Sequence, residues 1–554
     1  MIFQELKNMQ NFTISGQLID LFERRIYPAT ISVLNGKISS VKEMNEAPQQ
    51  YILPGFIDAH VHIESSMLVP TAFARLAVVH GTVATVSDPH EIANVNGAEG
   101  VEYMISNARQ SPFKFFFGAP SCVPATVFET AGANLDSQAV AALLTSPDIW
   151  YLSEMMNYPG VRYKDPEVMR KIEAAKNAGK PIDGHAPGLK GEMAISYASA
   201  GITTDHECFT LDEALDKINA GMHILIREGS AAKNYEALCS LLKSHPEKVM
   251  FCSDDKHPDE LVLHHINQLI KRSLQKGYDL FDVLSAACVN PVLHYKLPVG
   301  LLRKGDPADF VVIDNTEQFN VLQTYINGEL LAEKGKTLLP HVAVAIINNF
   351  KAQPRDIADF ALKTNHENPM IRVIEAIEGQ LVTNELMMPA KVVDGKIISD
   401  TERDVLKMLV VNRYEEKAAV SIAFVKNFGL KYGALASTVA HDCHNIIAVG
   451  VDDASLCAAV NALIGCKGGI SVAENSNMVS FMPLAIAGLM SADDGYSVAE
   501  QYSGLDKKAK ELGTTLKAPF MTLSFMALLV IPSLKLSDKG LFNGQEFKFT
   551  SLEV

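Results

Sequence analysis

Eight β-prone runs follow one another between about residue 50 and residue 298, and each is followed by a helix-like segment. Their expected ends lie 21 to 34 residues apart. Eight strand–helix units of this size predict an α/β fold, a (β/α)8 barrel of about 250 residues. An open doubly wound sheet is disfavoured because no Gly-rich phosphate loop follows the first run. The expected strand ends are His60, Asp88, Pro120, Glu154, His185, His206, Arg227 and Asp254.

Two of the intervening segments carry clear helix signals. Asp165 is a good N-cap, Pro166 suits a first helical turn, and Gly179 ends the apolar periodicity. Thr210 and Glu213 have the spacing of a capping box before a second apolar stripe. Both helices fall where the barrel requires one.

The flanks of the barrel carry hairpin signals. Asn35-Gly36 and Asn327-Gly328 each stand between β-prone runs, which is the strongest short-range hairpin pattern. We therefore expect a small β-domain split between residues 1–53 and 298–345, with the barrel at 54–297. Residues 346–554 mix strand and helix patterns beyond a polar connection near 352–369, which predicts an additional C-terminal α+β domain. An apolar content of 48% is ample for these cores.

Composition excludes several classes of protein. A net charge of −15 disfavours binding to nucleic-acid phosphates or anionic lipid. The eight cysteines form no C-x-x-C pair, so neither a zinc knuckle nor a disulfide framework is expected. Residues 1–7 lack the pattern of a signal peptide, and the longest apolar stretch, at 521–531, is too short for a bilayer of about 30 Å. We expect a cytoplasmic protein that acts on a small molecule.

The expected strand ends bring together metal-ligating residue types. Because the C-terminal ends of barrel strands share one mouth, these side chains are expected to converge. Nitrogen and oxygen donors suit Zn, Mn or Fe(II), and a carboxylate placed to bridge suggests two ions. A lone histidine there more often satisfies a strand-end hydrogen bond, but His60-Val61-His62 together with the others favours metal. The candidate ligands are His60, His62, Glu154, His185, His206 and Asp254.

Other polar residues near the mouth are weaker candidates. Those that could touch the substrate are Asp88, His90, Glu91, Arg227 and Ser230. A polar loop with internal hydrogen bonds explains the first three slightly better, and a structural salt bridge is the alternative for Arg227. His441 and His444 could close over the site from the C-terminal domain, or belong to a surface or subunit-interface loop.

Longer motifs carry a family resemblance. Residues 54–62, Pro-Gly-Phe-Ile-Asp-Ala-His-Val-His, resemble the first-strand motif of the amidohydrolase superfamily, metal-dependent barrel hydrolases and deaminases. Residues 62–67, 87–94, 184–188, 253–258 and 439–446 resemble segments of the bacterial adenine deaminases. Glu154 stands where many superfamily members have a carboxylated lysine, which argues against the hydantoinase and dihydroorotase branches.

The resemblance implies hydrolysis of adenine to hypoxanthine and ammonia in purine salvage, by a homo-oligomer, most simply a dimer. It also implies two divalent ions, Mn or Fe(II) with Zn as an alternative. Carried over by position, His60, His62, Glu154 and Asp254 hold one ion. Glu154, His185 and His206 hold the other, so that Glu154 bridges.

The chemistry of the reaction suggests two catalytic residues. Asp254 is expected to take the proton of the metal-activated water and pass it to a ring nitrogen or the departing amine. Glu64 is the candidate acid for a ring nitrogen, with the orientation of a ligand histidine as an equal alternative. The zinc base deaminases with a Pro-Cys-x-x-Cys motif are excluded because this chain lacks it. Rival hypotheses are a deacetylase or cyclic amidase on the same scaffold, and a non-catalytic metal-binding barrel.

Overall fold

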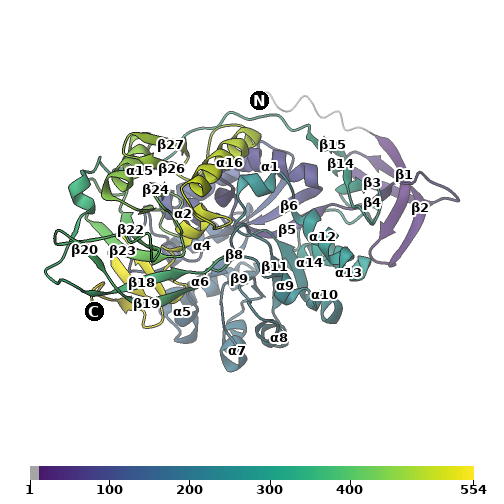
Figure 1. The fold of residues 1–554 in the computed structure, drawn as a ribbon. Coiled ribbons are helices and arrows are strands. Elements are labelled where there is room, and N and C mark those ends of the chain that lie inside the picture. The colour runs from purple at the N-terminus through teal and green to yellow at the C-terminus, as the bar shows by residue number, and fades with distance from the viewer. Residues whose placement is uncertain (1–10) are drawn as a thin grey trace.

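The computed structural model describes residues 11–554, so the expectation about a signal peptide at residues 1–7 lies outside the described part. Figure 1 shows three regions in a row: a β-rich region with β1 and β2 at one end, the barrel in the middle, and a mixed region with α15 and β20 at the other. Within residues 11–554, no helix is both long and apolar enough to cross a membrane.

The central region is a closed barrel of eight parallel strands. Two parallel sheets, β5 to β9 and β10 to β12, make up the wall. The amide of Thr203 donates to Ile182 O at 2.9 Å between β9 and β10. A parallel bridge joins Val61 to Asp254 between the first and last strands. The strands are β5 (Phe56–Val61), β6 (Thr82–Ser87), β7 (Lys114–Ala119), β8 (Ile149–Met155), β9 (Ile182–Gly184), β10 (Thr204–Asp205), β11 (His223–Arg227) and β12 (Val249–Cys252).

The predicted (β/α)8 fold is therefore confirmed, and each expected strand end lies within two residues of the end of an observed strand. Short 3-10 helices accompany the barrel: η1 (Ile63–Ser66), η2 (Val78–His80) and η3 (Pro246–Lys248). The element η4 (Ser285–Val289) is a short π-helix. The α-helices around the barrel are α1 (Pro70–Ala77), α2 (His90–Asn96), α3 (Ala98–Ala108), α4 (Ser137–Leu144), α5 (Tyr158–Arg162), α6 (Pro166–Asn177), α7 (Gly191–Ser199), α8 (Leu211–Asn219), α9 (Tyr235–Leu238), α10 (Leu241–Ser244), α11 (Pro258–Leu261), α12 (Ile266–Gln275), α13 (Leu280–Leu284) and α14 (Asn290–Tyr295).

The two helices expected from capping signals both form. The Asp165 side chain accepts from the amides of Glu167 and Val168 at the start of α6. At α8 the prediction is only half right. Thr210 accepts from the amide of Glu213, but the Glu213 carboxylate does not return to Thr210. It accepts from Gly188 N at 2.7 Å and from Lys217 Nζ, one turn further along α8, at 2.9 Å.

Asp165→Ala should loosen the start of α6. Removing an N-cap side chain costs about 1 kcal/mol, so amide exchange in α6 is expected to speed up by about fivefold at constant pH. Hydrogen–deuterium exchange with mass spectrometry measures this, and α8 in the same protein is the internal control. Unchanged exchange in α6 would show that barrel packing alone fixes the helix start.

One sheet flanks the barrel and uses strands from both sides of it in sequence. Its order is β16-β15-β14-β13-β4-β1-β2-β3. Leu53 in β4 pairs antiparallel with Val311 in β13. Positive φ angles at Asn35 (54°) and Asn327 (49°), each followed by glycine, make both predicted hairpin turns. The division of the chain at 53, 297 and 345 stays a prediction. The strands are β1 (Phe12–Asp20), β2 (Arg25–Leu34), β3 (Lys37–Glu43), β4 (Tyr51–Pro54), β13 (Phe310–Ile313), β14 (Val321–Ile326), β15 (Glu329–Glu333) and β16 (Lys336–Thr337).

The C-terminal region is built on a second eight-stranded sheet, ordered β19-β18-β23-β22-β25-β24-β26-β27. Its strands are β18 (Met370–Ala376), β19 (Thr383–Pro389), β22 (Val405–Val411), β23 (Val420–Lys426), β24 (Ala434–Ser437), β25 (Ile446–Gly450), β26 (Gly469–Asn475) and β27 (Met478–Pro483). Smaller sheets and helices complete the region: β17 (Leu362–Lys363), β20 (Lys391–Val393), β21 (Lys396–Ile398), β28 (Leu534–Ser537), β29 (Gly540–Asn543), β30 (Lys548–Phe549), α15 (Asp453–Cys466), α16 (Gly495–Glu511) and α17 (Pro519–Phe525).

Part of the expected polar connection is ordered structure. The segment 352–369 contains a 3-10 turn, η5 (Ile357–Phe360), as well as β17. Phe360 is fully buried in a core that includes Leu409 and Leu456. The mixed composition of 352–369 did not reveal this anchor in the sequence pattern.

Candidate active site

The first part of the site gathers at the ends of β5 and β12. His60 and His62 point to the same face because they lie two residues apart on an extended chain. Their Nε2 atoms are 3.1 Å apart. Asp254 Oδ1 lies 3.7 Å from His60 Nε2 and 3.3 Å from His62 Nε2. All three side chains are buried.

Glu154, near the end of β8, links this group to a second one. Its Oε1 lies 3.5 Å from His62 Nε2. Its Oε2 lies 2.9 Å from His185 Nδ1 and 3.0 Å from His206 Nε2. The six residues expected as ligands are therefore brought together, with the Glu154 carboxylate between the two groups.

The donor atoms fit divalent metal ions. His62 Nδ1 lies 3.2 Å from the carbonyl oxygen of Asp88, so the ring donates there and its Nε2 keeps a free lone pair. Burial and the neighbouring rings of His206 and His62 hold the pKa of His60 well below its ordinary value, so this ring is neutral. His185 Nε2 is buried and has no hydrogen-bond partner within residues 11–554. Imidazole nitrogens and carboxylate oxygens gathered at these distances are donors that suit divalent metal ions.

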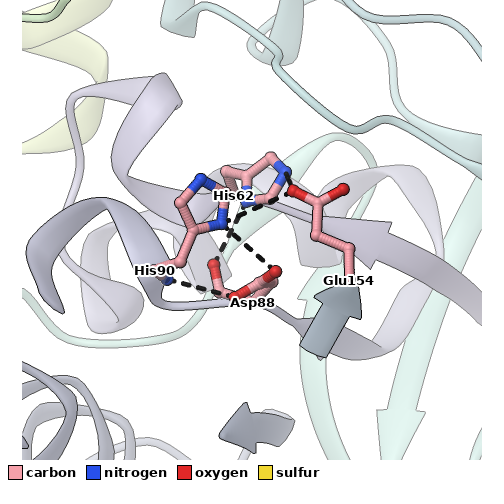
Figure 2. A group of neighbouring side chains, drawn as sticks. All are labelled: His62, Asp88, His90 and Glu154. Atoms are coloured by element: carbon pink, nitrogen blue, oxygen red, sulfur yellow. Dashed lines mark hydrogen bonds and ion pairs between the residues drawn. The ribbon is translucent and has the colours of Figure 1, made fainter. Parts of the chain in front are cut away.

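A third group adjoins the first, as Figure 2 shows for His62, Asp88, His90 and Glu154. His90 Nδ1 lies 3.2 Å from Asp88 Oδ2 and 3.5 Å from Glu154 Oε1. His90 begins α2, and its own amide donates to Asp88 Oδ1 at 3.1 Å. His90 lines the cavity, whereas Asp88 lies behind it.

Arg227, at the end of β11, is held by two carboxylates. Its guanidinium pairs with Asp254 and with Glu207, and it is 2% exposed. Burial raises the pKa of the Asp254 carboxyl, but the Arg227 charge outweighs this and holds that pKa well below its ordinary value. The structural salt bridge weighed for Arg227 is present, and the side chain also lines the cavity.

The candidates Ser230 and Glu64 also lie outside the cavity lining. The Ser230 hydroxyl donates to Glu260 Oε2 at 3.1 Å and accepts from the amide of His257 at 2.9 Å. Glu64 Oε1 accepts from the amide of Ile92, in the first turn of α2, at 3.2 Å. Burial raises the pKa of Glu64 to about 7. Neither side chain is among the residues around the cavity.

The C-terminal region forms the wall opposite the metal-ligating groups. His441 and His444 are 3% and 1% exposed, so the alternative of a surface loop is wrong for them. His441 Nδ1 lies 2.6 Å from Glu91 Oε1, and His444 Nε2 contacts Glu91 Oε2. The cavity residues from this region are Leu381, His441, Asp442, Phe525 and Leu528.

Sequence reasoning missed Glu207 and Asp255, both of which line the cavity. Each directly follows a candidate ligand, His206 and Asp254 respectively, which is a signal that was available. From the C-terminal wall it named His441 as a candidate, but it missed Leu381, Asp442, Phe525 and Leu528. No spacing rule joins residues that lie several hundred positions apart.

Comparison with known proteins fits this architecture. Residues 51–331 match the amidohydrolase family, and residues 380–548 match the adenine deaminase C-terminal domain. The adenine deaminase of Salinibacter ruber is 55% identical over 97% of this chain and 98% of its own. That of Methanosarcina acetivorans is 53% identical over 97% of this chain and 98% of its own.

Among solved structures, a β-aspartyl dipeptidase from Fervidobacterium islandicum AW-1 aligns with a TM-score of 0.43 at 15% identity. The alignment covers 59% of this chain and 98% of that one. The two family matches and the full-length relatives together show that the chain belongs to the amidohydrolase family, in its adenine deaminase branch.

Proposed function

We propose that the protein hydrolyses adenine to hypoxanthine and ammonia. The observation that carries the proposal is the position of Glu154, between His62 on one side and His185 with His206 on the other. Carboxylate and imidazole donors on both sides of one carboxylate suit a pair of metal ions, and such ions activate water for hydrolysis. The relatives named adenine deaminase match along nearly the whole chain, which supports adenine as the substrate.

The residues divide into two ligand groups. His60, His62 and Asp254 would hold one ion, His185 and His206 the other, and Glu154 would bridge. Two divalent ions, Mn or Fe(II), suit these nitrogen and oxygen donors, and Zn also fits them. When bound, such ions lower the pKa of water to about 7 and thereby supply the nucleophile.

Asp254 is the proposed proton carrier. Arg227 keeps its carboxylate ionised and oriented, so the carboxylate is ready to accept the proton of the attacking water. The same carboxyl group then returns the proton to the amine that leaves C6. Glu64 holds the first turn of α2, which carries His90 and Glu91, and this contact supports a positioning role.

The proposal extends to assembly and domain division. We propose a homodimer, which light scattering on the eluting protein would test. The split β-domain, the barrel and the C-terminal domain are proposed to meet near residues 53, 297 and 345. Limited proteolysis would test these boundaries.

Adenine turnover should depend on added metal. Protein stripped by a chelator is expected to release no ammonia from adenine, because the carboxylates and imidazoles cannot activate water without a cation. Reconstitution with Mn²⁺ or Fe²⁺ should restore activity at two ions per chain, followed as the ultraviolet change from adenine to hypoxanthine.

A panel of N-acetylated sugars and cyclic amides tests the rival substrates. Turnover of an amide but not of adenine would support a deacetylase or cyclic amidase instead. Metal binding without turnover of any compound would support a non-catalytic barrel.

A further inference from the structure

The segment 439–446 of the C-terminal region reaches the barrel mouth at Glu91, in the first turn of α2. The Glu91 carboxylate lies between His441 and His444, and all three side chains are less than 4% exposed. Three such groups could in principle form another metal site. The hydrogen bonds around the two rings argue for a different role.

His444 is oriented as a donor to Glu91. Its Nδ1 accepts from the amide of Ala440 at 3.2 Å, so the ring proton must sit on Nε2. That Nε2 contacts Glu91 Oε2. A ring nitrogen that carries a proton has no lone pair for a metal ion. His444 therefore faces Glu91 with a protonated nitrogen, and the Glu91 carboxylate is enclosed between the two rings.

His441 has one nitrogen left over. Its Nδ1 is used on Glu91 Oε1, at 2.6 Å. Its Nε2 is buried, has no hydrogen-bond partner among the described residues, and lies 3.9 Å from Asp255 Oδ1. The ring lines the cavity that Glu154 and Asp254 also line. A buried polar atom of this kind needs a partner, and the cavity is where one can come from.

The His441 ring packs on an aromatic side chain whose backbone is anchored by a buried lysine. The His441 ring stacks on Phe525, with centroids 4.9 Å apart and planes at 24°. The buried Lys535 ammonium donates to the carbonyl oxygens of Phe525, at 2.9 Å, and Leu381, at 2.6 Å. Both of those residues line the cavity. His441 is thus held in one orientation, as a residue that positions a small planar ligand must be.

We propose that His441 contacts the purine directly, through a hydrogen bond from Nε2 to a ring nitrogen, and so turns C6 of the base toward Glu154 and Asp254. The inference rests on the proposed function and names the residue that orients its substrate. Burial lowers the pKa of His441, but the Glu91 and Asp255 carboxylates more than compensate and raise it to about 9. Both nitrogens of the charged ring donate, which matches the lone pairs at N1, N3 and N7 of adenine.

The test combines His441→Gln with substrates that lack one ring nitrogen. In the unaltered protein, one of the 1-, 3- and 7-deazaadenines should bind about 10- to 100-fold more weakly than adenine, since it loses a charge-assisted hydrogen bond. His441→Gln should weaken the binding of adenine by a similar factor and leave the binding of that one analogue nearly unchanged. Metal content, measured by plasma emission, should stay at the unaltered value.

Three comparison variants sharpen the result. His441→Asn is the second variant should the glutamine protein fail to fold. His444→Gln is expected to affect adenine and all three analogues equally, because His444 acts through Glu91. His366→Gln, which changes an exposed histidine paired with Glu553, is the matched control and should behave as the unaltered protein.

If His441→Gln weakens the binding of adenine and of all three deazaadenines equally, the proposal is overturned in favour of a structural role. Unchanged KM and kcat for adenine would overturn it as well. Loss of a metal equivalent from His441→Gln or His444→Gln would overturn it in favour of a third metal site. If the unaltered protein binds adenine but releases no ammonia, the proposed function fails, while the analogue pattern still decides whether His441 contacts the base.

Discussion

Asp254→Asn is expected to lower kcat for adenine by about 10²- to 10⁴-fold, the usual contribution of a positioned acid–base group. The substitution keeps the shape of the side chain and an oxygen facing His60 and His62, which lie 3.7 and 3.3 Å from Oδ1. An amide cannot accept the proton of the attacking water. Much of the metal should remain bound, because Glu154 and the four histidines are untouched.

The measurement pairs steady-state turnover with metal analysis of the same sample. Asp212→Asn changes an exposed carboxylate in the first turn of α8 and is the matched control. A kcat within tenfold of the unaltered value would remove Asp254 from the proton path. Loss of most of the metal would instead assign Asp254 to ligand binding alone.

The barrel was predictable because its signal is local and repeated. The sequence shows eight β-prone runs, and most of them end at a polar residue such as Glu154 or His206, which would be costly to place inside the barrel core. Closure then follows from the count of eight. The six candidate ligands were found by the same logic, since the C-terminal ends of parallel strands share one mouth.

The parts that escaped prediction depend on contacts between distant segments. Glu91 and His441 lie 350 positions apart and meet only because the C-terminal region packs on the barrel mouth. The Glu213 carboxylate accepts from the amide of Gly188, 25 residues earlier, and does not complete the predicted capping box with Thr210. Phe360 anchors a segment whose composition is polar. Each case is decided by tertiary burial, which a single sequence does not display.

Arg227 shows the same limit within the site. Its position at the end of β11 was predicted correctly, but position alone cannot separate a substrate contact from an ion pair. The structure brings Asp254 and Glu207 to the guanidinium, and the pairing of three buried charges leaves the arginine little freedom. Glu207 was missed because His206, directly before it, accounted for the strand end.

Glu154→Gln is expected to have the opposite signature to Asp254→Asn: metal is lost first, and turnover with it. The glutamine side chain is neutral and presents an amino group where Oε1 or Oε2 now faces a histidine nitrogen. The substitution thereby removes the negative charge that would lie between the two proposed ions. Substitution of a residue that supports a ligand lowers metal affinity by about 10- to 100-fold. Loss of a bridging ligand should therefore lower metal affinity by at least about 100-fold.

Metal titration of the stripped Glu154→Gln protein, with activity followed in parallel, measures this effect. Glu511→Gln, an exposed pair of Lys507, is the control. Two ions bound with unaltered affinity would refute the bridge, because no other carboxylate in the described part of the chain contacts both His62 and His185. Retained metal without turnover would give Glu154 a role in the chemistry itself. The proposed division of labour requires the two variants to differ: one that holds metal without transferring protons, and one that no longer holds metal.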